Sequence, residues 1–101
     1  EGISIARLSQ QGGRPPIPLH QPLPRYTDFA RQFRIEGTIL LKGIIIEDGS
    51  VVNLRCIRNL GWGLDEAAIL QVQDRWKFEP ATLNGRPLPV EANIEVSFRL
   101  Y

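Results

Sequence analysis

The fold is decided by a stretch near the end of the chain, Val90-Glu91-Ala92-Asn93-Ile94-Glu95-Val96-Ser97-Phe98-Arg99-Leu100. Apolar and other residues alternate along it, so the two kinds of side chain lie on opposite faces of an extended backbone. This alternation is typical of an antiparallel strand with one buried face and one face in water. The sequence therefore predicts a sheet in which this strand is half-buried.

Upstream of this strand, the region from Gly37 to Arg58 predicts a hairpin. Its turn is Asp48-Gly49, because glycine tolerates the positive φ angle that tight turns need. Three residues share one face of each strand: Ile39, Leu41 and Ile45 in the first, and Val52, Leu54 and Cys56 in the second. Gly43 stands at an inward position and indicates a bulge or a close-packed neighbour.

Two segments have the pattern of helices. Residues 27–34 form a short one, with Thr27 or Asp28 as its cap and with Phe29 and Phe33 one turn apart. Residues 64–76 form a longer one, in which Leu64, Ala68, Val72 and Trp76 recur every four residues as a buried stripe does. The order helix, strand, strand, helix, strand predicts an α+β fold, a small antiparallel sheet with two helices packed on one face.

The first 23 residues differ in composition from the rest. Five of the eight prolines lie within residues 15–24, and proline favours an extended, semi-rigid backbone. We therefore interpret residues 1–23 as the end of a Pro-rich linker, with a short extra strand near Ile3 and Ile5 as an open alternative. A chain of 101 residues suits one domain, which we assign to residues 24–101.

Composition and charge argue against several classes of function. The formal net charge is +1, and the arginines are scattered along the chain, which does not favour nucleic-acid binding. His20 and Cys56 are the only residues of their kinds and lie far apart, so the sequence predicts no catalytic pair, no metal site and no cofactor. The chain has no apolar run of the roughly 20 residues that cross a bilayer.

Several short motifs occur in an order that resembles the C-terminal domain family of the TonB energy transducers. The matching motifs are Pro24-Arg25-Tyr26, Ala30-Arg31, Arg34-Ile35-Glu36-Gly37, Asp48-Gly49, Leu64-Asp65, Ala67-Ala68, Trp76-Lys77-Phe78-Glu79-Pro80-Ala81, Asn84-Gly85 with Pro87, and Val96 with Phe98. The resemblance covers residues 24–101. Thr27 and Gly43 depart from the family pattern, which usually has proline after the tyrosine and an apolar residue at the second position.

The resemblance implies a non-enzymatic function in the periplasm. Members of this family are anchored in the inner membrane, work with ExbB and ExbD, and bind the TonB box peptide of a TonB-dependent outer-membrane transporter. The peptide is expected to add as a strand to the sheet. By this resemblance the peptide-binding residues are Leu23, Pro24, Arg25, Tyr26, Val90, Glu91, Ala92, Asn93, Ile94, Glu95, Val96, Ser97, Phe98 and Arg99.

Some alternatives stay open at the level of sequence. The domain is either the peptide-binding end of a transducer or a related envelope module. Such a module would bind a protein or the cell wall without driving transport. A homodimer formed by exchange of the last strand is compatible with an exposed edge. Tyr26 is either a peptide anchor or a core staple, and Trp62 either packs on the second helix or contacts a partner.

Overall fold

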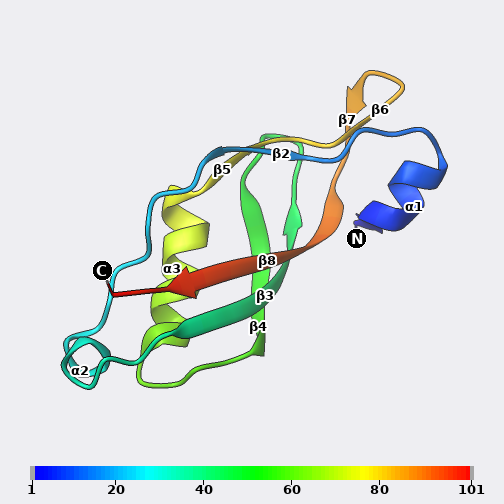
Figure 1. Cartoon of the computed structure of the whole chain (residues 1–101). Helices are drawn as coiled ribbons and strands as arrows, with labels where there is room; N and C mark the ends of the chain where they lie inside the picture. Colours follow the sequence, from blue (N-terminus) through cyan, green and yellow to red (C-terminus); the bar gives the residue numbers. More distant parts are fainter. Residues whose placement is uncertain (1, 101) are drawn as a thin grey trace.

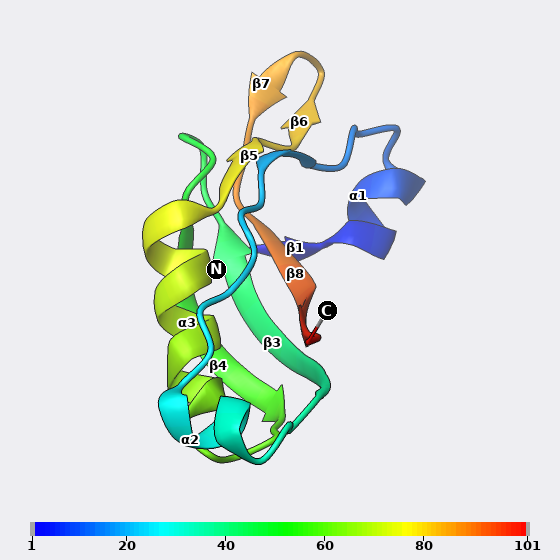
Figure 2. The same ribbon diagram turned by 60° about the vertical axis from the view of Figure 1, so that its left-hand side comes forward.

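The structure, a computed structural model, describes residues 2–100 and centres on a four-stranded sheet with the strand order β1-β8-β3-β4 (Figure 1). The two central strands are β8 (Val90–Phe98) and β3 (Gly37–Ile45), and β4 (Val51–Arg58) forms one edge. Helix α3 (Leu64–Arg75) lies across one face of the sheet (Figure 2). The prediction of an α+β fold is confirmed.

Strand β8 pairs with β3 along its whole length. The antiparallel register runs without a shift from Gly37 opposite Phe98 to Ile45 opposite Val90. Every second residue of β8 is buried, and the five buried residues are Val90, Ala92, Ile94, Val96 and Phe98. The alternation in the sequence therefore correctly predicted both the strand and its buried face.

Gly43 makes room for a bulge in β4. Lys42 lies opposite Arg55 and Ile44 opposite Val52, so one residue of β3 faces two residues of β4. A side chain at position 43 would press on Leu54 and Val51, whose nearest carbon atoms lie 2.9 and 3.0 Å from an ideal Cβ. The prediction for Gly43 is confirmed, but the bulge shifts the alternation. Val51 is buried, whereas its neighbour Val52, which the sequence placed on one face with Leu54 and Cys56, is exposed.

The two predicted helices are present. Leu64, Ala68 and Val72 of α3 are completely buried and Trp76 nearly so, which confirms the stripe. The Asp65 carboxylate accepts the backbone N–H groups of Leu60 (2.9 Å) and Gly61 (3.0 Å). Helix α2 (Asp28–Gln32) is shorter than predicted and is capped by Thr27.

The N-terminal segment carries three elements where the sequence predicted mainly a linker. Strand β1 (Ile3–Ser4) pairs in parallel with β8, which makes the main sheet mixed; helix α1 (Ile5–Gln10) follows. Strand β2 (Ile17–His20) pairs antiparallel with β5 (Lys77–Glu79). Leu8 of α1 is fully buried, and this burial holds the segment against the domain. The proline-rich composition did not indicate that this segment packs on the domain, because a single buried leucine leaves no periodic pattern.

A second hairpin joins β6 (Thr82–Leu83) to β7 (Arg86–Pro87). Its turn residues Asn84 and Gly85 have φ angles of 54° and 79°, the left-handed conformation of a tight turn. The turn predicted at Asp48-Gly49 is also present, and the Gly49 carbonyl accepts the N–H of Phe78 at 3.1 Å. This bond ties the β3–β4 turn to β5.

Candidate peptide-binding site

The segment before α2 is fixed to helix α3 by three side-chain hydrogen bonds. The amide Nε2 of Gln71 donates to the carbonyls of Pro22 and Leu23, each at 3.0 Å. The indole Nε1 of Trp76 donates to the Pro22 carbonyl at 3.2 Å. Gln71 is only 5% exposed, so its two bonds satisfy a donor that would otherwise be buried without a partner. The extended backbone of Leu23 is therefore held in place although its side chain is 76% exposed.

Tyr26 connects this segment to the end of β8. Its hydroxyl donates to the carbonyl of Ile35 at 2.7 Å, and its ring meets that of Phe98 edge-on with centroids 5.4 Å apart. Desolvation and the nearby Glu36 carboxylate raise the pKa of the phenol. Because its hydroxyl and its ring both contact residues of the domain itself, Tyr26 fixes this segment to the core.

Thr27 caps the start of α2 and links it to a distant loop. Its Oγ1 accepts the N–H of Ala30 at 3.2 Å as an N-cap. The same hydroxyl donates to the carbonyl of Trp62 at 2.9 Å, which links the segment to the loop before α3. Proline at this position would supply neither bond, so the threonine gives this chain a contact of its own.

The two predicted parts of the peptide site meet in a groove at the end of β8. Leu23, Pro24 and Tyr26 line one side of it, and Ser97, Phe98 and Arg99 line the other, around a cavity of about 140 Å³ in volume. Arg25 takes no part in this groove and faces helix α3 instead. The structure thus brings the predicted segments 23–26 and 97–99 together, with Arg25 as the exception.

The far edge of β8 is free over most of its length. Strand β1 covers only its start, where Ile3 pairs with Val90 and Ser4 with Glu91. Among residues 2–100, no strand pairs with this edge from Ala92 to Phe98. The free edge of β8 therefore begins at Ala92, two residues later than the start at Val90 that the sequence predicted. Inward side chains of this stretch are buried, so an added strand would meet mainly its backbone.

Comparisons with known proteins decide the family. Residues 22–100 match the family described as Gram-negative bacterial TonB protein C-terminal. The chain belongs to the TonB C-terminal domain family. It is 28% identical to Protein TonB of Vibrio cholerae over 86% of this chain and 36% of that protein. It is 31% identical to Protein tonB2 of Pseudomonas aeruginosa over 81% of this chain and 30% of that protein. The chain thus spans about a third of the length of these relatives.

A solved structure supports the fold of this TonB-family domain. The solution NMR structure of the Pseudomonas aeruginosa TonB CTD superposes with a TM-score of 0.67 at 22% sequence identity. The match covers 84% of this chain and 86% of that one. The shared architecture therefore includes most of the chain, and the family match over residues 22–100 confirms the sequence resemblance.

An exposed group of aromatic side chains on the surface of this TonB-family domain was not predicted from the sequence. Phe29 and Phe33 share a helix face as expected, but they are 49% and 58% exposed. The ring of Phe29 stacks on Trp62, with centroids 5.1 Å apart, and lies 4.7 Å from that of Phe33. Helical spacing identified the pair but could not tell a buried face from an exposed one. Trp62 both packs on Phe29 and remains 52% exposed.

The remaining chemically distinctive residues do not form a cluster. Cys56 is half-buried on β4, and desolvation together with Asp65 and Glu66 raises the pKa of its thiol. Within residues 2–100 no three side chains of the His, Cys, Asp and Glu types come together as metal ligands would. No helix in that range has the length and apolar character needed to cross a membrane.

Proposed function

We propose that this domain binds the TonB box peptide of an outer-membrane transporter by adding it as a strand to the free edge of β8. The observation that carries the proposal is the unpaired edge from Ala92 to Phe98, which ends beside the anchored Leu23–Tyr26 segment. Strand addition uses backbone hydrogen bonds for affinity and nearby side-chain pockets for specificity. The groove at Leu23 and Ser97 supplies such a pocket at the end of the edge.

The anchoring of the segment supports this function energetically. Gln71 and Trp76 hold its backbone before any peptide arrives, so binding need not order it. The outward residues Asn93, Glu95 and Ser97 are exposed and leave the edge accessible. The proposed peptide-binding residues are those predicted by resemblance apart from Arg25, which faces α3, with the edge contacts concentrated in residues 92–99.

The proposed role of the whole protein follows from the family. It would be an energy transducer and not an enzyme, anchored in the inner membrane with this domain in the periplasm. Through parts outside this chain it would work with ExbB and ExbD, which draw on the proton-motive force. A pull transmitted to a strand-paired peptide loads many backbone hydrogen bonds together, which suits a domain that must hold its partner under force.

A titration followed by NMR tests the binding site. A TonB box peptide from a transporter of the same bacterium is added to the labelled domain, and amide shifts are expected along residues 90–100 and at Leu23–Tyr26. Shifts gathered on β4 instead would contradict the proposal. Sedimentation at the same concentration shows whether the domain is a monomer, because a homodimer through β8 would compete with the peptide.

Backbone-methylated peptides provide the matched control. In an added strand, alternate N–H groups face the neighbouring strand. Methylating the nitrogens that face β8 should abolish binding, whereas methylating the intervening ones should leave much of it. Equal tolerance of both sets would show that the peptide does not bind as a strand.

A further inference from the structure

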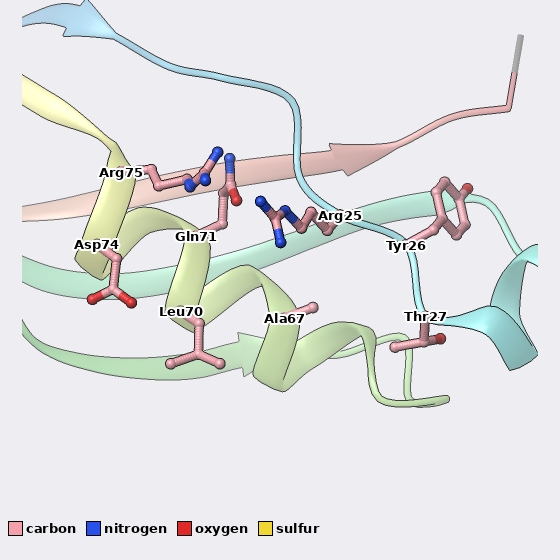
Figure 3. Close-up of a pocket in the computed structure, with 8 residues that line it drawn as sticks. All are labelled: Arg25, Tyr26, Thr27, Ala67, Leu70, Gln71, Asp74 and Arg75. Atoms are coloured by element: carbon pink, nitrogen blue, oxygen red, sulfur yellow. The ribbon is translucent and has the colours of Figure 1, made fainter.

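A second groove lies between the Arg25–Thr27 segment and helix α3 (Figure 3). Its cavity measures about 310 Å³, at the small end of the range of about 300–1,000 Å³ for ligand pockets. Its lining residues are Arg25, Tyr26, Thr27, Ala67, Leu70, Gln71, Asp74 and Arg75. The peptide site proposed above uses the β8 side of the same segment, so this groove is a separate surface.

The base of the groove is an apolar strip at the margin of the core, where Ala67 packs partly against the core and Leu70 is exposed. Ala67 and Leu70 lie three residues apart on α3, which places them on one side of the helix. Leu70 is 56% exposed, in contrast to the fully buried Leu64, Ala68 and Val72. The opposite wall is rigid, because Gln71 anchors its start and Thr27 caps α2 at its end.

Two arginines give the groove its charge. Arg25 and Arg75 are both exposed, and Figure 3 shows their guanidinium groups directed toward Gln71, with the Asp74 carboxylate turned away. Between residues 2 and 100 the single ion pair is Lys42 with Glu91 at 3.8 Å, so neither arginine has a carboxylate partner. Guanidinium groups bind carboxylates in a bidentate geometry and are weakly hydrated, which suits them to interfaces.

We propose that this groove docks an acidic segment of a partner protein, in which a carboxylate side chain lies next to an apolar one. The carboxylate binds between Arg25 and Arg75, and the apolar side chain packs on Leu70 and Ala67. A simple inorganic anion would use the arginines alone, whereas the exposed apolar strip favours a ligand with both features. The rigid wall reduces the entropy that docking must overcome.

The test compares two blocked peptides by NMR titration up to about 10 mM, which covers millimolar affinities. The probes are Ac-Leu-Glu-Leu-Glu-Leu-NH2 and its neutral isostere Ac-Leu-Gln-Leu-Gln-Leu-NH2. The acidic peptide should shift the amides of Arg25, Ala67 and Leu70 and bind about fivefold more tightly than the neutral one. Equal affinities, or shifts that avoid this groove, would overturn the proposal.

Charge-matched variants complete the test. The double variant Arg25→Gln/Arg75→Gln should reduce binding of the acidic peptide to the level of the neutral one. Arg58→Gln/Arg86→Gln removes the same charge from exposed positions outside the groove and should leave binding unchanged. A similar loss in both variants would indicate only general electrostatic attraction. Inorganic phosphate that displaces the acidic peptide at equal concentration would show an anion site instead.

Discussion

The two long strands that can offer an edge, β8 and β4, differ in regularity. Strand β8 keeps one register with β3 over nine residues, whereas the β3–β4 pairing shifts twice, between Lys42 and Ile44 and between Leu40 and Leu41. Asn53 in β4 adopts a left-handed φ of 55°. Bulges bend a strand and interrupt its row of backbone groups, which discourages pairing with another chain.

This difference supports the proposal that a partner strand adds to β8 and not to β4. The inward side chains of β8 are all buried, so the domain core fixes this strand in one register with β3. On β4, Val52 and Ile57 are 38% and 53% exposed, and the strand is less firmly tied to the core. An accessible edge is therefore useful for binding only where the core fixes its geometry.

The largest expected effect comes from removing the core support of β8. Phe98→Ala should lower the free energy of unfolding by about 3–5 kcal/mol, because the ring is fully buried and packs on Tyr26. Ile57→Ala on β4 should cost about 0.5 kcal/mol or less, since its side chain is half exposed. Urea denaturation measures both, and equal losses would remove the distinction between the strands.

Loss of the anchor beside β8 should have a smaller effect. Gln71→Ala removes both bonds to the Pro22 and Leu23 carbonyls and should lower the free energy of unfolding by about 1–3 kcal/mol. Peptide affinity should fall as well, because the segment is no longer fixed. Gln73→Ala, at an exposed position of the same helix, is the control and should change neither quantity appreciably.

The pocket at the end of β8 can be tested without disturbing the fold. Leu23→Ser should raise the Kd for the TonB box peptide about tenfold, because an exposed leucine loses the apolar area that the peptide would cover. Ile57→Ser makes a similar change on β4 and should leave the Kd unaltered. Calorimetric titration gives both values, and a reversed order would place the peptide on the β4 side.

The smallest effect concerns Cys56 on β4. Its raised pKa means that the folded protein retains a proton that the unfolded chain releases above its ordinary pKa of 9.0. The resulting stabilisation is complete below pH 9.0 and is lost as the pH rises through the folded pKa. Iodoacetamide should therefore alkylate Cys56 more slowly in the folded than in the urea-unfolded protein at pH 8.5 (about half a unit below that pKa). Equal rates would contradict a protected thiol.

Much of the fold was predictable because its signals are local. Alternation identified β8, spacing of four identified α3, and Asp48-Gly49 identified the hairpin of β3 and β4. The bulge at Asn53 was predicted only indirectly, through the glycine opposite it on β3. Only one of the two roles of Thr27 was predictable. Its capping function follows from the sequence, whereas its bond to Trp62 spans 35 residues.

The sequence by itself determined strands β3, β4 and β8 and the main helix, because periodicity and turn chemistry depend on neighbouring residues, and its motifs indicated the family. Only the tertiary structure decided which face of α2 is exposed, how β1 shortens the β8 edge, and how Gln71 and Trp76 hold the segment at Leu23. These features arise from contacts between residues distant in the chain. No local pattern encodes such contacts, because each depends on where the whole fold places its partner.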